Sequence, residues 1–576
     1  MKDFTKEQSP DEPAIPRDEG VERPLRQALA RYLGGSSPAS LFSMWTDWSV
    51  HLAMAPDKQA DLARRAAGHW LSWMTFVTQG CPDDAEARPI LPQTSDRRFR
   101  DDGWKSPPFA AWEQGFLLAE DFWDKATSDI PGLDPAHDRA MTFVMRQMLD
   151  AVAPTNFVAT NPEVLARTVE TGGANLQHGV SRFLQDRQKM HRKTGNAQVG
   201  KEVATSKGEV VYRNHLIELI QFAPTTDAVH PEPILIVPAW IMKYYILDLS
   251  PGNSLVRYLT DHGFTVFMIS WRNPGAEDAD LGMQTYLDQG PRAAIDHITK
   301  ATGSAKLHTA GYCLGGTLLS MAAAAMARDG DDRLASMTLL AAQTDFSEPG
   351  ELSLFINESR VSFLEDLMRV QGYLDAEQMM SAFQMMRSND LIWSQMVRKF
   401  LLGEDDAPMN DLMAWNADST RMPARMHAEY LRHMFLNNDL AAGRYHVDGH
   451  PVSLRDIRVP VFAVGTETDH IAPWKSVFKI HNLGHADVTF ALTNGGHNAG
   501  VLSEPGHARR HFRIHTTGDA HKALTPEDWF TAATLKDGSW WPAWAQWLSG
   551  MSGEKIKPPK ITKSLGPAPG TYVTME

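Results

Sequence analysis

The residues best suited to chemistry in this chain surround a single cysteine. The stretch LHTAGYCLGGTLLSMA occupies residues 307–322, and its segment GYCLG, residues 311–315, has the spacing G-x-nucleophile-x-G, with Cys313 where many hydrolases carry serine. This pattern predicts a strand that turns sharply into a helix and holds the Cys313 thiol at the turn. The N–H of Leu314 then faces the oxyanion that forms during acyl transfer, and the helix N-terminus favours a thiolate.

An acid and a base follow in the order that such a nucleophile requires. Asp469 comes just after the apolar stretch 459–465, and His497 just after the apolar stretch 488–493. Loops at strand ends are where open α/β sheets build their sites, and the order nucleophile, acid, histidine is that of elbow enzymes. Taken singly, Asp469 also fits a helix N-cap and His497 an ordinary loop histidine. The three matches in the correct order favour a catalytic triad.

A second oxyanion donor is expected from the turn after the apolar stretch 233–241. The backbone N–H of Trp240 or of Ile241 is the candidate, because two N–H groups are usually needed to bind an oxyanion. This expectation comes from topology, and it does not depend on either side chain.

A cysteine nucleophile favours acyl transfer over hydrolysis. An acyl group on Cys313 is a thioester, so loading it from another thioester is close to neutral in energy, and the acyl group keeps its transfer potential. A hydroxyl acceptor can then take it to form a more stable oxygen ester. His497 would accept the thiol proton and could later serve the hydroxyl. Asp469 would either orient His497 or help to activate that hydroxyl, and the sequence leaves both roles open.

The elements that must position these residues alternate between apolar strands and helices. Residues 265–271, 307–312 and 337–343 are further apolar stretches separated by helical segments. This rhythm predicts an α/β class fold, with a mainly parallel sheet covered on both faces. Residues 346–445 break the rhythm with helical, methionine-rich segments, which predicts a helical cap inserted over the sheet.

The chain divides by composition into three parts. Residues 1–24 are rich in Pro, Asp and Glu and are expected to form a disordered tail. Residues 25–195 have the spacing of amphipathic helices, which predicts a helical N-terminal domain. Residues 196–576 are expected to form the catalytic domain.

Charge and cysteine content exclude several classes of protein. The net charge of −14 argues against general binding to nucleic acid or to anionic membranes. Two cysteines, Cys81 and Cys313, are too few for a disulfide framework or a cysteine-rich zinc site. There is no apolar run of about 18 residues, so no membrane span is expected, and the expected location is the cytoplasm. We predict no catalytic role for Cys81.

The motifs resemble those of the polyhydroxyalkanoate synthases, in particular the single-subunit type. GYCLGGT resembles the lipase-like box of that family, TETDHIAPWKS its acid motif and GGHNAG its histidine motif. Further similarity extends over about residues 100–576, including LMAWNADSTRMP in the cap and PAPGTYV near residue 570. The resemblance implies an α/β-hydrolase fold with a helical cap, preceded by a mainly helical N-terminal domain.

The resemblance also implies a function and a set of partners. The family nucleophile, acid and histidine map to Cys313, Asp469 and His497. The implied reaction is polymerisation of (R)-3-hydroxyacyl-CoA with release of coenzyme A, with no cofactor or metal besides this substrate. A homodimer at the surface of a polyester granule is implied as well. Two alternatives remain: an ester or thioester hydrolase with the same triad, and a granule-associated protein without activity.

Two further patterns have mainly structural interpretations. HARRHFRIH spaces His507, His511 and His515 so that they would line one face of a helix, but a solvated basic surface is favoured over a metal site. Trp541, Trp544 and Trp547 have near-helical spacing and are expected to pack in the core beneath the sheet.

Overall fold

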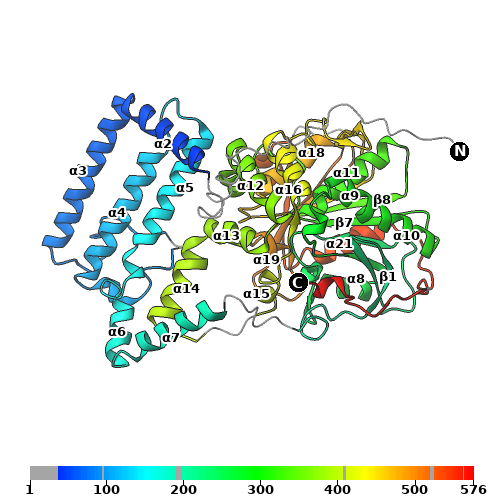
Figure 1. The fold of residues 1–576 in the computed structure, drawn as a ribbon, viewed down its shortest axis with the longest axis horizontal. Coiled ribbons are helices and arrows are strands. Elements are labelled where there is room, and N and C mark those ends of the chain that lie inside the picture. The colour runs from blue at the N-terminus through cyan, green and yellow to red at the C-terminus, as the bar shows by residue number, and fades with distance from the viewer. Residues whose placement is uncertain (1–36, 94–95, 190–197, 406–409, 519–523, 562) are drawn as a thin grey trace.

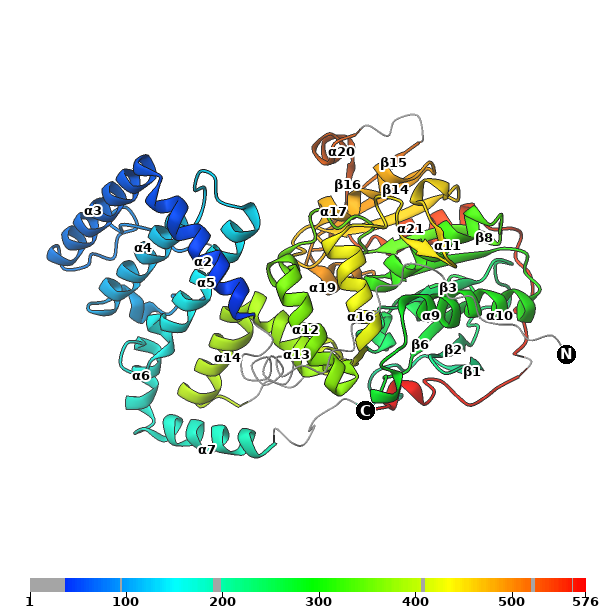
Figure 2. The same cartoon turned by 45° about the horizontal axis from the view of Figure 1, so that its top comes forward.

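The fold is seen in a computed structural model that describes residues 37–93, 96–189, 198–405, 410–518, 524–561 and 563–576. The tail expected at residues 1–24 lies outside the described residues. In Figures 1 and 2 the N-terminal helices form a lobe beside the sheet, and the helices of residues 351–436 lie between the two.

The N-terminal lobe is made of helices whose starts are encoded locally. Proline occupies the first turn of four of them, and Ser37, Asp134 and Asn161 cap three with side-chain oxygens. The helices are α2 (Pro38–Ala53), α3 (Pro56–Thr78), α4 (Phe109–Thr127), α5 (Pro135–Val152), α6 (Pro162–Glu170) and α7 (Ala174–Lys189).

A ten-stranded sheet forms the core of the rest of the chain. Its order is β1-β2-β6-β3-β7-β8-β13-β14-β15-β16, in which the strands from β6 to β14 run parallel and those at either side pair antiparallel. The strands are β1 (Gly208–Arg213), β2 (Ile217–Phe222), β3 (Ile234–Val237), β6 (Val266–Trp271), β7 (Leu307–Tyr312), β8 (Leu334–Leu340), β13 (Val461–Thr466), β14 (Val488–Thr493), β15 (His511–Thr517) and β16 (Thr534–Asp537).

Both faces of this sheet are buried, as a parallel sheet requires. Leu235 and Val237 of β3 belong to one apolar cluster, whereas Ile234 and Ile236 belong to a second cluster on the opposite face. The first cluster includes α9 (Met283–Leu287), α10 (Ala293–Thr302) and α11 (Leu314–Arg328), and the second includes α8 (Leu255–Asp261) and α21 (Trp541–Gly550). Shorter helices complete the layers: α17 (Trp474–Phe478), α18 (Ile480–Leu483), α19 (His497–Val501) and α20 (Pro526–Ala532).

A helical insertion between β8 and β13 separates the sheet from the N-terminal lobe (Figure 2). It contains α12 (Glu358–Gln371), α13 (Ala376–Met386), α14 (Ser394–Met396), α15 (Asp411–Asn416) and α16 (Ala424–Tyr430), with the turns η7 (Asn389–Trp393), η8 (Val397–Leu401) and η9 (Leu431–Leu436). Two short strands within it, β9 (Tyr373–Leu374) and β10 (Met422–Pro423), pair with each other. We call residues 346–445 the cap.

The N-terminal lobe contacts the cap along several elements. The Ser388 hydroxyl donates a buried hydrogen bond of 2.8 Å to Asp150, and the Asn175 amide donates one of 2.7 Å to the carbonyl of Leu401. A Cβ added at Gly179 of α7 would lie 1.9 Å from the carbonyl oxygen of Phe400, so only glycine permits this approach. The lobe is therefore fastened to the cap.

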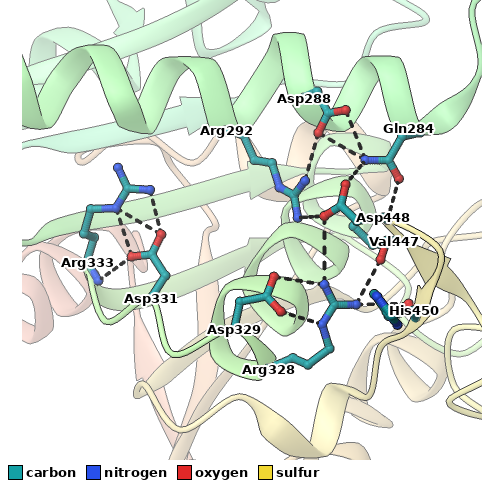
Figure 3. A network of polar contacts seen from close by, with 10 residues as sticks. All are labelled: Gln284, Asp288, Arg292, Arg328, Asp329, Asp331, Arg333, Val447, Asp448 and His450. Atoms are coloured by element: carbon teal, nitrogen blue, oxygen red, sulfur yellow. Dashed lines mark hydrogen bonds and ion pairs between the residues drawn. The ribbon is translucent and has the colours of Figure 1, made fainter. Parts of the chain in front are cut away.

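A network of ion pairs fixes the point where the chain leaves the cap (Figure 3). There the hairpin of β11 (His446–Val447) and β12 (His450–Pro451) lies against α9, the segment just before α10 and the end of α11. Arg328 donates to the carbonyls of Val447 and His450, at 2.9 and 3.0 Å, and Arg292 pairs with Asp448 at 2.8 Å. The base of the cap is thus anchored on the helix that follows Cys313.

The structure confirms the predicted fold class and corrects three details. His511 and His515 lie in the strand β15, so the helical interpretation of HARRHFRIH is wrong. β8 runs from Leu334 to Leu340, three residues earlier than the predicted stretch 337–343. The β9–β10 pair is a feature that the sequence did not predict. None of the described helices is both long and apolar enough to cross a membrane.

Candidate active site

The turn at Cys313 has the strained geometry that the glycine spacing predicts. β7 ends at Tyr312 and α11 begins at Leu314, and between them Cys313 has φ +51° and ψ −125°, a conformation that costs free energy for a non-glycine residue. Only glycine fits at position 315, because a Cβ added there would lie 2.0 Å from the carbonyl oxygen of Val237. The elbow therefore rests directly on the end of β3.

Main-chain hydrogen bonds hold Cys313 in this conformation. Its N–H donates to the carbonyl of Leu340 at 2.9 Å, and its carbonyl accepts from the N–H of Gly316 at 2.9 Å. The side chain is half-buried. Leu314 is the first residue of α11, so its N–H has no acceptor within the helix and is available to a ligand.

The acid and the histidine meet at the carboxyl ends of β13 and β14. Asp469 Oδ2 lies 2.8 Å from His497 Nδ1, and the Asp469 side chain is completely buried. The same Oδ2 accepts from the Thr466 hydroxyl at 2.8 Å, and Oδ1 accepts from the N–H groups of Ile471 and Ala472, each at 2.9 Å. Every hydrogen bond fixes the carboxylate as an acceptor, so Asp469 is built to stay ionised.

The electrostatics of the pair favour a protonated imidazole. Burial opposes a charge on His497, but the charges of Asp469 and Cys313 and hydrogen bonds to both outweigh it, so the pKa of His497 is raised well above its usual value. Burial likewise opposes the Asp469 charge, but His497, the Ala472 N–H and the Thr466 hydroxyl lower the pKa of Asp469 below its usual value. Cys313 thus acts on His497 from the side opposite in role to Asp469, as a nucleophile would act on its base.

A hydrogen bond joins the neighbours of the nucleophile and of the base. The Tyr312 hydroxyl donates to Asn498 Oδ1 at 2.6 Å, and the Tyr312 ring centroid lies 5.7 Å from that of His497. On the other side, the indoles of Trp540 and Trp541 donate to the carbonyls of α19 at 3.1 and 3.0 Å. The short helix that carries His497 is therefore held at several points.

The Trp240–Ile241 turn is held by the cap. The Thr420 hydroxyl donates to the carbonyl of Trp240 at 2.6 Å, and the Thr420 N–H donates to the carbonyl of Ile241 at 3.1 Å. The Trp415 indole also donates to the carbonyl of Lys243 at 2.7 Å. No backbone acceptor for the N–H of Trp240 or of Ile241 is found in the part of the chain that the structure describes.

Aromatic side chains from the cap pack beside the Trp240–Ile241 turn. Burial raises the pKa of the Tyr430 phenol well above its usual value, and the charge of Cys313 adds to this rise. The Tyr430 ring lies 6.1 Å from Trp240 and 6.2 Å from Phe346, centroid to centroid. The cap therefore presents aromatic rings to this turn, a largely apolar surface that suits an acyl chain better than a charged group.

Comparison with known proteins identifies the family. Residues 95–259 match the family described as poly-beta-hydroxybutyrate polymerase (PhaC) N-terminus, residues 18–58 match a poly-beta-hydroxybutyrate polymerase N-terminal family, and residues 232–501 match the alpha/beta hydrolase fold. The poly(3-hydroxyalkanoate) polymerase of Methylorubrum extorquens is 40% identical over 92% of this chain and 88% of its own length.

Two further relatives agree over similar lengths. Poly(3-hydroxyalkanoate) polymerase subunits PhaC of Rhizobium meliloti and Cupriavidus necator are each 36% identical over 90% of this chain, and over 86% and 89% of their own lengths. The chain belongs to the poly(3-hydroxyalkanoate) polymerase family. It is therefore an enzyme of the acyltransferase type, as the sequence motifs predicted.

In this polymerase the structure brings the predicted residues to one edge of the sheet. Asp469 and His497 are in contact, Cys313 interacts with His497, and Leu314 and the Trp240–Ile241 turn flank the elbow. Their catalytic roles stay predictions. No cluster of three His, Cys, Asp or Glu side chains that could hold a metal occurs among the described residues.

Several residues that shape the polymerase site were missed by the sequence analysis. Thr466 has a weak local signal, since a hydroxyl three residues before an acid at a strand end can reach its carboxylate. Tyr430 and Thr420 have none, because they lie more than 100 residues along the chain from the Trp240–Ile241 turn that they contact. Arg510, a neighbour of the three histidines, donates to the carbonyl of Ala499 at 2.6 Å and so braces α19.

Proposed function

We propose that this polymerase joins (R)-3-hydroxyacyl groups from coenzyme A thioesters into a polyester, through an acyl thioester on Cys313. Support comes from one observation above all: the Asp469–His497 pair and Cys313 converge at a strained elbow, in a chain that belongs to the polymerase family. The hydroxyacyl unit is proposed because the relatives are poly(3-hydroxyalkanoate) polymerases, and the coenzyme A thioester is proposed from the resemblance of the motifs.

The proposed acylation step balances within these residues. His497 takes the thiol proton, the Cys313 sulfur forms a bond to the thioester carbonyl carbon, and the carbonyl π electrons move to oxygen. When the tetrahedral intermediate collapses, the bond to the coenzyme A sulfur breaks, and His497 returns the proton to that sulfur. The oxyanion is bound by N–H groups, for which Leu314 and the Trp240–Ile241 turn are the candidates.

The elongation step uses the same base. The hydroxyl of the next acyl unit gives its proton to His497, and its oxygen attacks the Cys313 thioester, which releases the thiolate. Because a thioester is exchanged for an oxygen ester, this step is favourable. Asp469 is held as an ionised acceptor against His497, which supports an orienting role, and its three other donors leave it poorly placed to bind a hydroxyl as well.

Granule association is also part of this proposal. The N-terminal lobe leaves large apolar side chains open to solvent, with Phe42 at 74% and Trp70 at 60% exposed. Exposed apolar side chains of this size mark surfaces that bind other apolar matter. We also propose a cytoplasmic homodimer, on the family resemblance alone.

A direct assay distinguishes the proposal from its alternatives. The protein is mixed with 3-hydroxybutyryl-CoA, and free thiol and turbidity are followed together. A polymerase produces both signals, a hydrolase gives thiol without insoluble polymer, and a granule-associated protein without activity gives neither.

Matched cysteine variants provide the control. Cys313→Ala should abolish thiol release. Cys81→Ala should leave it unchanged, because Cys81 is buried in the N-terminal lobe and burial raises the pKa of its thiol. Thiol release that survives Cys313→Ala would refute the proposed intermediate.

A further inference from the structure

We infer that Thr420, a residue of the cap, positions the second oxyanion donor and that this donor is the N–H of Ile241. The inference rests on the proposed function, since an oxyanion forms only if Cys313 attacks a carbonyl. Thr420 is 1% exposed and lies where the cap chain passes the Trp240–Ile241 turn.

The geometry of one peptide unit indicates that the second oxyanion donor is the N–H of Ile241 and not that of Trp240. The carbonyl of Trp240 and the N–H of Ile241 belong to the same planar trans peptide, so they point in opposite directions. The Thr420 hydroxyl holds that carbonyl at 2.6 Å, and it therefore fixes the direction of the Ile241 N–H as well. The N–H of Trp240 belongs to the preceding peptide, on which no hydrogen bond from Thr420 acts.

A second hydrogen bond prevents this peptide from rotating. The N–H of Thr420 donates to the carbonyl of Ile241 at 3.1 Å, so one residue holds the carbonyls on both sides of Ile241. A hydrogen bond to a peptide carbonyl also polarises the N–H of the same peptide, which makes it a stronger donor. The turn begins just beyond β3, on which the elbow of Cys313 rests, so the turn and the nucleophile lie at the same edge of the sheet.

Thr420 is itself fixed from two directions. Just after it, β10 pairs with β9 of the cap, and the N–H of Arg421 donates to Asn273 Oδ1 at 2.9 Å. Just before it, Asp418 accepts a hydrogen bond from the Tyr245 hydroxyl at 2.9 Å. Thr420 is thus a positioning residue, and through it the placement of the cap determines the placement of the oxyanion donor.

The test compares two reactions of Cys313 in the Thr420→Val variant. Valine keeps the shape of the threonine side chain but lacks its hydroxyl. The first-turnover release of coenzyme A from 3-hydroxybutyryl-CoA passes through an oxyanion, whereas alkylation of the thiol by iodoacetamide does not. We expect release to slow by roughly 10-fold or more, with KM nearly unchanged, because loss of one oxyanion donor costs about 10²–10³ in kcat and misplacement costs part of that. We expect the alkylation rate of Cys313 to stay within about twofold.

Two variants separate the hydroxyl from general disturbance of the loop. Thr420→Ser retains the donor and should recover most of the rate, and Ser419→Ala alters the neighbouring side chain and should leave the rate unchanged. An unaltered alkylation rate also shows that the elbow and its imidazole are folded.

The inference is overturned if Thr420→Val releases coenzyme A at the unaltered rate. It is also overturned if release and alkylation slow by the same factor, because the defect would then lie in the thiol and imidazole. Failure of the proposed function is a different result: coenzyme A release that survives Cys313→Ala in the same assay.

Discussion

The two sides of the active site are built on different supports. Cys313, Asp469 and His497, which we call the sheet side, stand at the ends of β7, β13 and β14 and are held by hydrogen bonds within the sheet domain. The Trp240–Ile241 turn, which we call the cap side, is held by Trp415 and Thr420 of the inserted cap.

This difference separates two requirements of the reaction. The sheet side makes the nucleophile, and the hydrogen bonds that hold the Cys313 main chain and the Asp469 carboxylate lie within the sheet domain. The cap side stabilises the oxyanion, and the turn has the correct geometry only when Trp415 and Thr420 of the cap are in place. A movement of the cap would therefore change acyl transfer without changing the reactivity of the thiol. The N-terminal lobe contacts the cap through Asp150, Asn175 and Gly179, so a change in the lobe can act on the cap side through these contacts.

The largest expected effect comes from the sheet side, in Asp469→Asn. The charge of Asp469 is the leading cause that raises the pKa of His497, so its removal lowers that pKa and the imidazolium is lost at a lower pH. Without an adjacent imidazolium the thiolate forms only at higher pH. We expect coenzyme A release to slow by about 10³-fold or more at neutral pH, as with the acid of other triads.

The pH dependence of alkylation checks the sign of this prediction. The midpoint for iodoacetamide reaction at Cys313 should move to higher pH in Asp469→Asn. A midpoint that stays in place would show that Asp469 does not act through His497, and the distinction between the two sides would lose its basis.

A smaller effect is expected for Tyr312→Phe, which removes one hydroxyl between the sheet-side residues. The hydrogen bond to Asn498 at 2.6 Å is worth about 1 kcal/mol, so roughly a fivefold loss of rate is expected in both coenzyme A release and alkylation. The double variant Tyr312→Phe/Asn498→Ala should be no slower than the slower single variant. If the free-energy losses of the two single variants add fully in the double variant, the two residues act independently.

A cap-side variant of modest effect is Trp415→Phe. It removes the hydrogen bond to the carbonyl of Lys243, two residues beyond Ile241, and keeps an aromatic ring. We expect coenzyme A release to slow by roughly two- to threefold. The lost hydrogen bond acts on Lys243 and only indirectly on the Ile241 N–H, so about 0.5 kcal/mol of transition-state stabilisation is lost. The alkylation rate should not change; a parallel loss in alkylation would contradict the division into two sides.

The smallest effect is expected where the lobe meets the cap. Ser388→Ala removes a buried hydrogen bond to Asp150, worth about 1 kcal/mol, and leaves Asp150 paired with Arg98. Hydrogen exchange in residues 376–401 should become faster, and both reactions of Cys313 should stay within about twofold. A large loss of alkylation would show that the lobe acts on the sheet side after all.

The sheet side could be predicted from sequence because its signals are local. Each of its residues follows an apolar stretch, and the glycines around Cys313 are required within a few residues of it. On the cap side, the sequence could narrow the second oxyanion donor only to the N–H of Trp240 or of Ile241. The contact that separates Trp240 from Ile241 comes from Thr420, which lies 180 residues away along the chain.

The errors in the predicted fold have related causes. β8 was placed late because its first half contains Ser336, a buried polar residue whose hydroxyl is paired with His308 at 2.8 Å. An apolar run cannot reveal a strand whose polar residues are satisfied by a neighbouring strand. β15 was missed because its histidines and arginine are only half-buried and hide the alternation of Phe512 and Ile514. The core packing of the tryptophans is confirmed for Trp541 and Trp544, which are buried, whereas Trp547 is only partly buried against the same cluster.

The most direct test of the account is the mass of the Cys313 peptide after a brief reaction with 3-hydroxybutyryl-CoA. The account predicts one hydroxybutyryl group or a short oligomer on Cys313, which hydroxylamine removes as expected for a thioester, and none on Cys81. An unmodified Cys313 peptide during active turnover, or the acyl group on another residue, would contradict it.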